Sequence, residues 1–265
     1  MNSIKQPPST APVTSAEFMA WRRDPAAAHR RRHAPPRQET APAPNPPALR
    51  RPAAPSAALR RLEDRQVVNH YAAALLRDGA NVEALFGRPG RVHFLKHYLV
   101  PERWTVRTDA VFLPRDGSAA SVIGIRAAVP ARDRAGAFLP EAADLFRLAY
   151  QRFTMRQAKV PAERCLLLLL NPDYRNDVGA PDLREMFECH DATRFIDEPA
   201  GPGAPPIAAV VAEEAVLATA YLQSESPAAA PLRRVRHIPQ DTPEHLSREG
   251  RDAIGRILGR ETERA

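Results

Sequence analysis

Apolar side chains recur at helical spacing in several parts of the chain. Residues 56–81 begin at Ser56, which can cap a helix, and an Asp-Gly pair ends the pattern. Residues 140–158 and 207–223 have helical patterns as well, and a shorter helix is predicted from Thr14 or Ser15 with an interruption at Pro25. The predicted inward positions are Leu59, Leu62, Val67, Tyr71, Ala74 and Leu75 in the first segment, and Leu145, Leu148, Ala149 and Phe153 in the second.

Three segments have the composition of strands. Trp104–Leu113 and Ala120–Val129 flank the turn sequence RDGS, so we expect them to pair antiparallel. The stretch RCLLLLLN at residues 164–171 is apolar on both faces, which is typical of a central strand in a covered sheet. The order helix, strand, strand, helix, strand predicts an α/β fold, with a mixed central sheet flanked by helices.

The 28 prolines lie mainly outside these apolar segments and define the expected organisation. We expect a disordered Pro/Arg-rich N-terminal region followed by one folded domain. The predicted parts are a tail at 1–13, a short helical segment at 14–33, a Pro-rich linker at 34–55, an α/β core at 56–198 and a helical C-terminal extension at 199–265. Within the last two, residues 181–196 are predicted as a turn and short helix, and residues 245–261 as an amphipathic helix.

Positive charge is concentrated near the N-terminus. Residues 1–62 hold eleven Lys or Arg against three acids, a net charge of +8, whereas the whole chain carries +7. Such an arm can bind phosphate backbones by neutralising charge and releasing counterions, and a solvated arginine-rich tail is the alternative. The candidates for contact with DNA or RNA are Arg22, Arg23, Arg30, Arg31 and Arg32.

The two cysteines, Cys165 and Cys189, are far apart and cannot form a zinc or iron–sulfur site by themselves. They are expected to be reduced, mostly buried thiols in a cytoplasmic protein. No secretory signal or membrane-spanning segment is expected, although an organellar transit peptide stays open.

One resemblance depends on the stretches TDAVF, VIGIR, AYQRF and LLLLLNPDY in this order. Together they resemble the PD-(D/E)XK nuclease superfamily, particularly its RecB-like bacterial branch, which implies a restriction-endonuclease-like core. In that family an Asp on the second core strand and a Glu-x-Lys on the third surround Mg²⁺ or Mn²⁺, and a Gln with an aromatic residue on the next helix completes the site. Asp109 and Gln151 match, with Tyr150 and Phe153 nearby, but Gly124 replaces the Glu and Arg126 the Lys.

The resemblance extends outward in patches over residues 14–197. Asp24 stands where relatives begin an iron–sulfur site with Cys, and the three C-terminal cysteines of those relatives are absent, so no iron–sulfur cluster is expected. Further positions that match a family segment are Tyr174, Gly179, Asp182, Leu183, Met186, Phe187, Asp191 and Thr193.

The two departures on the third strand weaken the metal chemistry. An arginine is a permanent cation that repels a divalent ion. We therefore expect an Asp109–Arg126 ion pair in place of the metal. A migrated carboxylate is the alternative, and Asp144 is the best candidate because it precedes Gln151 by about two helical turns. Further candidates for the migrated carboxylate are Glu141, Asp133 and Glu83, and His70, beside Asn69, could replace an acid on the first helix. His93 and His97 could bind zinc as a pair. For each of these residues a purely structural role is the alternative.

The resulting hypothesis is a catalytically inactive nuclease-like domain, without cofactor, that binds nucleic acid or serves as a scaffold for a protein partner. The first alternative is an active nuclease using Asp109, Asp144, Gln151 and Arg126 with Mg²⁺ or Mn²⁺, of which Asp109 would be a ligand. The second is a protein-interaction domain without a nucleic-acid role. No membrane partner is expected.

Overall fold

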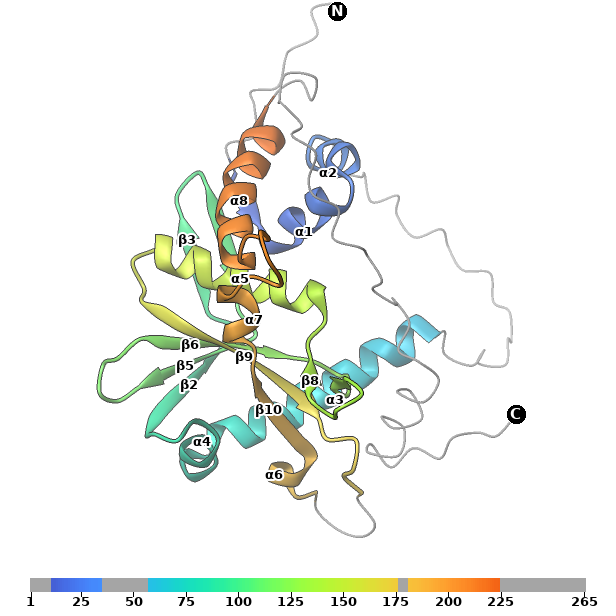
Figure 1. Cartoon of the computed structure of the whole chain (residues 1–265), viewed down its shortest axis with the longest axis vertical. Coiled ribbons are helices and arrows are strands. Elements are labelled where there is room, and N and C mark those ends of the chain that lie inside the picture. The colour runs from blue at the N-terminus through green and yellow to red at the C-terminus, as the bar shows by residue number, and fades with distance from the viewer. Residues whose placement is uncertain (1–10, 35–56, 176–180, 225–265) are drawn as a thin grey trace, which may run out of the picture.

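A five-stranded mixed sheet forms the centre of the computed structural model, which describes residues 11–34, 57–175 and 181–224 (Figure 1). Its order is β10-β9-β6-β5-β2. The pair β6 and β9 is parallel, and the other neighbours are antiparallel. The strands are β2 (Gly90–Phe94), β5 (Ala110–Pro114), β6 (Ala120–Ile125), β9 (Ala162–Leu170) and β10 (Phe187–Asp191). The predicted mixed α/β class is confirmed.

The helix α5 (Ala142–Gln157) connects the parallel strands β6 and β9, as a crossover between parallel neighbours requires. It packs on one face of the sheet, and its predicted inward residues are confirmed: Leu145, Leu148 and Ala149 are buried, and Phe153 is partly buried against the same core. A small hairpin, β7 (Ala131–Arg132) and β8 (Phe138–Leu139), precedes it.

The opposite face of the sheet is covered by α3 (Ala57–Arg77), α4 (Gly79–Phe86) and α6 (Leu183–Met186). The side chain of Asp78 caps α4 and separates it from α3. The buried positions of α3 are Val68, Ala72, Leu75 and Leu76. Of the described positions in the predicted stripe, only Leu75 is buried, because the sheet contacts a face rotated by about one residue.

A second, three-stranded sheet corrects the hairpin prediction. Its order is β1-β4-β3, with β1 at Val13–Thr14, β3 at His97–Val100 and β4 at Trp104–Arg107. The predicted strand Trp104–Leu113 is therefore wrong as one strand: Thr108 donates from its amide to the Lys96 carbonyl, and the chain passes between the sheets at Asp109. Only β5 pairs with β6, which ends at Ile125 rather than Val129.

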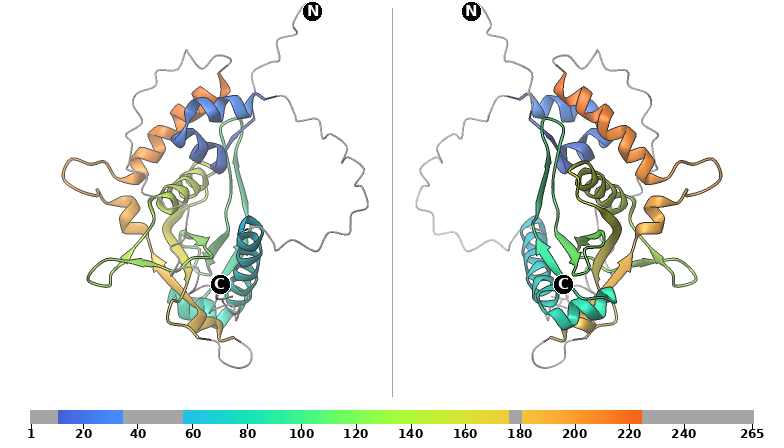
Figure 2. Two further views of the ribbon diagram at one scale, coloured as in Figure 1. Left: turned by 90° about the vertical axis from the view of Figure 1, so that its right-hand side faces the viewer. Right: turned by 90° about the vertical axis from the view of Figure 1, so that its left-hand side faces the viewer.

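The N-terminal segment packs against the body. Asp24 ends α1 (Ser15–Arg23) and caps α2 (Pro25–Arg32), so the predicted break at Pro25 is confirmed. Phe18 of α1 stacks on Tyr150 of α5 with a centroid distance of 4.5 Å, and the Tyr150 hydroxyl donates to the Val13 carbonyl at 2.7 Å. The predicted C-terminal helix, α8 (Ile207–Gln223), lies beside α1, α2 and α5 (Figure 2).

Residues 181–196 are only partly helical, which corrects the prediction. The short α6 leads into β10, and α7 (Thr193–Asp197) follows it. FECHD forms a strand because β9 offers a free edge for pairing. The expected tail up to residue 10, the linker from 35 to 55 and the helix at 245–261 lie outside the described residues. Within the described ranges, no helix is long and apolar enough to cross a membrane.

Replacement of Phe18 by Ala tests whether α1 folds cooperatively with the core. The buried ring is lost from its stack on Tyr150, so we expect the free energy of unfolding to fall by about 3–5 kcal/mol in urea denaturation. Leu99, whose side chain is 54% exposed, is the matched control, and Leu99→Ala is expected to change stability by less than about 0.5 kcal/mol. Equal stability of the two variants would contradict cooperative packing of α1.

Candidate functional site

Arg126 joins two carboxylates at the end of β6. Its Nη1 donates to Asp109 Oδ2 at 2.7 Å, and its Nε donates to Asp144 Oδ1 at 2.5 Å. The ion pair expected between Asp109 and Arg126 is therefore present, and the side chain of Arg126 is 13% exposed. The acid predicted as a migrated metal ligand binds the same guanidinium.

The fold explains why these three groups meet. The bend between β4 and β5 places Asp109 beside the end of β6, where Asp109 Oδ2 also accepts the Ile125 amide at 3.1 Å. Asp144 projects from the first turn of α5. Burial lowers the pKa of Arg126, but the charges and hydrogen bonds of Asp144 and Asp109 outweigh burial and raise it overall. The guanidinium therefore stays protonated.

Gly124, two residues before Arg126, points toward α5. A Cβ atom at this position would lie 3.2 Å from Leu167 Cδ2 and 3.6 Å from Arg126 Nη2. That Nη2 is buried and has no hydrogen-bond partner. The space beside the glycine thus contains a guanidinium nitrogen.

These residues do not fit a divalent metal ion. A metal site needs several oxygen ligands without a competing cation, whereas Arg126 binds one oxygen of each nearby carboxylate and brings a permanent positive charge into the site. Among the residues that the structure describes, no group of three or more His, Cys, Asp or Glu side chains is arranged to hold a metal.

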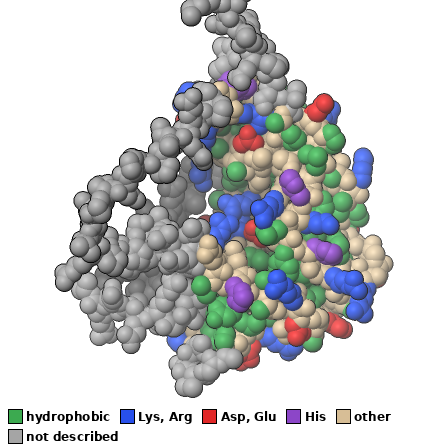
Figure 3. Space-filling model, turned by 180° about the vertical axis from the view of Figure 1, so that it is seen from behind, with side chains coloured by type: hydrophobic (Ala, Val, Ile, Leu, Met, Phe, Trp, Pro, Cys, Tyr) green, Lys and Arg blue, Asp and Glu red, His purple; other side chains and the backbone are tan. Residues whose placement is uncertain are grey.

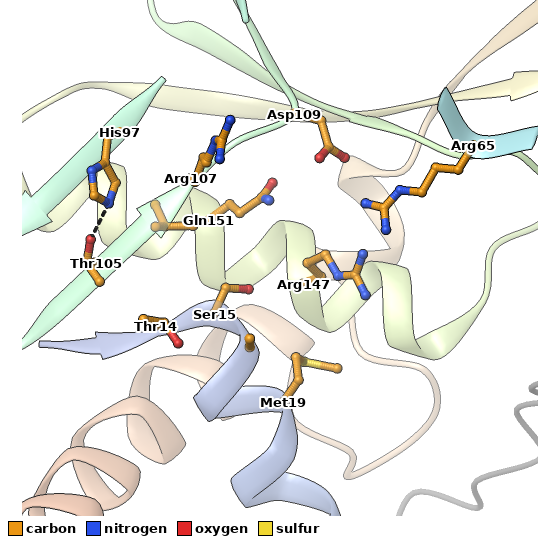
Figure 4. Close-up of a pocket in the computed structure, with 12 residues that line it drawn as sticks. Thr14, Ser15, Met19, Arg65, His97, Thr105, Arg107, Asp109, Arg147 and Gln151 are labelled. Carbon is orange, nitrogen blue, oxygen red and sulfur yellow. Dashed lines mark hydrogen bonds between the residues drawn. The ribbon is translucent and has the colours of Figure 1, made fainter. Parts of the chain in front are cut away.

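An open pocket of about 410 Å³ adjoins Asp109 (Figure 4). Its cations are Arg65 from α3, Arg107 from β4 and Arg147 from α5, and the N-terminus of α1 forms another wall. Burial, followed by repulsion from Arg126, lowers the pKa of Arg147. Gln151 also lines the pocket, with 2% of its surface exposed and no partner for its Oε1.

The other candidate acids and histidines lie elsewhere. Glu141 begins α5, and burial followed by the charge of Asp144 raises its pKa; Asp133 closes the β7–β8 turn; and Glu83 is exposed on α4. His70 is exposed on α3 and contacts Tyr71. His93 and His97 lie on different strands, so they do not form the helical pair that a zinc motif needs, and His97 bonds Thr105.

Phe153 and the two cysteines contribute to packing; Cys165 is buried, and Phe153 and Cys189 are partly buried. Phe153 packs edge-on against Trp104. Burial raises the pKa of both Cys165 and Cys189 to about 12, so the thiols stay protonated at neutral pH.

The family-like positions along the rest of the chain mostly cap or pack. Asp24 and Asp182 cap helices, and Asp191 accepts the Thr193 amide. Gly179 lies outside the described residues. The buried members are Tyr174, Met186 and Phe187, and Leu183 is partly buried against them.

The arginines of α1 and α2 divide into two groups. Arg22 donates to Glu214 at 2.5 Å and lies over the Phe146 ring, and Arg32 pairs with Glu17 at 2.6 Å. Arg22 holds the N-terminal segment on the body, and Arg32 joins α2 to α1 within that segment. Arg23, Arg30 and Arg31 are exposed. Basic side chains also occur across the face seen from behind, among apolar and uncharged ones (Figure 3).

Comparisons of this chain with family models, with curated proteins and with solved structures found no match.

Sequence reasoning missed the three arginines of the pocket. Arg65, Arg107 and Arg147 are about 40 residues apart, and no local pattern marks any of them. Only the bend at Asp109, which the strand pattern did not reveal, brings Arg107 beside α5.

Replacement of Arg126 by Met tests the two-carboxylate contact. The variant leaves Asp109 and Asp144 without their cation, so we expect a loss of about 3–5 kcal/mol in the free energy of unfolding at neutral pH. Arg134, which is exposed in the β7–β8 turn, provides the control, and Arg134→Met is expected to leave the urea midpoint nearly unchanged. Coincident unfolding curves for the two variants would show that the contact adds no stability.

Proposed function

We propose that this chain is a catalytically inactive, nuclease-like domain that binds nucleic acid. The observation that carries the proposal is the Arg126 guanidinium held between Asp109 and Asp144. It places a permanent cation against both carboxylates, which opposes a divalent metal there, and an arginine cannot act as a base at neutral pH. The domain therefore needs no metal cofactor.

The order of elements supports a restriction-endonuclease-like core. Helix α3 precedes the central-sheet strands β2, β5 and β6, and helix α5 and strand β9 follow them along the chain. Asp109 immediately precedes β5, the second of these strands. Gly124 lies on the third strand and Arg126 follows directly after it, while Gln151 lies on the following helix. These are the places that the family pattern gives to its Asp, Glu-x-Lys and Gln.

The distribution of charge supports binding to a phosphate backbone. The pocket beside Asp109 contains three arginines, and Arg23, Arg30 and Arg31 add exposed cations on α1 and α2. Arginine binds phosphate oxygens in a bidentate manner, and phosphate contacts of this kind do not depend on sequence. DNA and RNA are both included in the proposal. In the alternative without a nucleic-acid role, a protein partner would bind these exposed arginines instead.

A second candidate function is metal-dependent nucleic-acid cleavage with Asp144 as the migrated ligand. One observation favours it: Asp109 and Asp144 come from different elements and converge on one position. Mg²⁺ or Mn²⁺ would have to displace Arg126 from both carboxylates. The cost of leaving that cation buried without a partner favours the inactive domain.

A combined binding and cleavage assay separates these functions. We expect the full chain to bind single- or double-stranded DNA or RNA with an affinity that falls as salt rises, and to cleave none of them with Mg²⁺ or Mn²⁺. Asp109→Ala is the matched variant, with its fold checked by circular dichroism. Cleavage by the wild type that Asp109→Ala abolishes would establish the second candidate, and an absence of all binding would favour a protein partner.

A double variant tests the restriction-endonuclease-like arrangement by restoring its pattern. Gly124→Glu with Arg126→Lys supplies a carboxylate where a Cβ needs only small shifts of the Leu167 and Leu148 side-chain ends. It also frees Asp109 and Asp144 from the guanidinium. We expect it to bind Mn²⁺ in titration calorimetry and to melt at a higher temperature with Mn²⁺ present.

The control for this experiment is Gly124→Ala with Arg126→Lys, which adds the Cβ without the carboxylate. It is expected to bind Mn²⁺ more weakly or not at all. If the folded Glu variant binds no better than this control, position 124 does not correspond to the family's metal ligand.

A further inference from the structure

The pocket beside Asp109 carries an excess of positive charge. Arg65, Arg107 and Arg147 line it from three different elements, and within the described ranges none of them pairs with an acid. Asp109 is the acidic residue of the lining and already binds Arg126. Three arginines against one aspartate give the lining a net charge of +2. Because the field of Arg126 and burial both disfavour the charge on Arg147, an anion in the pocket would stabilise that residue.

The first turn of α1 adds to this positive potential. Thr14 caps this nine-residue helix, and Thr14, Ser15 and Ala16 all lie on the pocket wall. The capping box with Glu17 takes up the Thr14 and Glu17 amides, and Glu17 pairs with Arg32, so the pocket meets this helix end through the backbone of Ser15 and Ala16, where partial positive charge favours an anion. The backbone and the arginines thus act on the same volume, as Figure 4 shows.

Gln151 provides an independent indication of a ligand. The side chain is 98% buried, given that 2% of its surface is exposed, and it lies on the pocket lining with its Oε1 lacking a hydrogen-bond partner. A buried acceptor without a partner is costly, and it needs a donor. The dianion of a phosphate monoester offers only acceptors, so the donor for Gln151 Oε1 has to be a hydroxyl or N–H elsewhere in the same ligand.

The size and charge of the pocket narrow the ligand class. A volume of about 410 Å³ lies in the range of small-molecule sites, and Met19 and Val106 provide an apolar wall. A phosphate monoester carries a charge of about −1.5 to −2 at neutral pH, which matches the lining, whereas each phosphate within a strand carries a single negative charge.

We propose that this pocket binds the phosphate monoester of a nucleotide, either at the phosphorylated end of a nucleic-acid strand or in a free mononucleotide. The strand-end form rests on the proposed nucleic-acid binding, whereas the free-nucleotide form does not. Arg65, Arg107 and Arg147 hold the phosphate, and Gln151 accepts a hydrogen bond from the sugar or base.

The test measures binding of the full chain to fluorescent oligonucleotides of one sequence, as DNA and as RNA. The oligonucleotides end in a 5′-phosphate, a 3′-phosphate or only hydroxyl groups, and mononucleotides and inorganic phosphate serve as unlabelled competitors. We expect one phosphorylated end to bind at least about tenfold more tightly than the hydroxyl-ended strand at the same salt concentration. Arg147→Gln and Arg107→Gln should each remove this preference. Arg115→Gln, in the exposed β5–β6 turn, should keep it.

The outcomes separate this inference from the proposed function. If all strand ends bind equally and Arg147→Gln has no effect, the proposed phosphate-monoester site is rejected, while the proposed nucleic-acid binding stands. Binding of mononucleotides that Arg147→Gln weakens, without binding of any strand, would support the pocket and reject the proposed function. Absence of both would overturn both. Inorganic phosphate competing as well as a mononucleotide would overturn the role of Gln151.

Discussion

The contact of one guanidinium with two carboxylates determines how the site is built. Arg126 joins the end of β6 to Asp109, at the bend between the two sheets, and to Asp144, in the first turn of α5. The three elements are distant in sequence. If any one of them were displaced, the charged side chains of the others would lie in a half-buried region without a partner of opposite charge. A charge in such a region is tolerated only when it is paired and hydrogen-bonded, so the position of each element depends on the other two.

The N-terminal segment completes one wall of the same region. Phe18 stacks on Tyr150, whose hydroxyl donates to the Val13 carbonyl. Tyr150 lies about one helical turn after Arg147 on α5, so these contacts bring the first turn of α1 to the edge of the pocket. Arg22, considered from sequence as a nucleic-acid contact, instead pairs with Glu214 of α8 and covers the Phe146 ring. The arginines of α1 and α2 therefore have two roles. Arg22 and Arg32 form ion pairs within the fold, whereas Arg23, Arg30 and Arg31 are exposed to solvent.

Features encoded by local pattern could be predicted, and those created by contacts between distant residues could not. The apolar run of β9 and the helical periodicity of α5 and α8 were sufficient to locate these elements. The break at Thr108 depends on a hydrogen bond to Lys96, and the strand β10 depends on the edge of β9, so neither has a local signal. The Asp109–Arg126 pair was predictable because the resemblance to the nuclease pattern assigns these two positions to one site, whereas the pocket arginines follow no such pattern.

The electrostatic character of the region follows from its arginines and carboxylates. A divalent metal requires a surplus of carboxylate charge, which then attracts phosphate only through the metal. Here Arg126 offsets one of the two carboxylates it contacts, and the surrounding arginines reverse the sign of the potential, so the protein itself can attract phosphate. Arginine cannot accept a proton from water at neutral pH, and it supplies no open coordination position for a nucleophile. A site of this kind can bind a phosphate group tightly and still leave its ester bond intact, which is the physical basis of the proposed binding without cleavage.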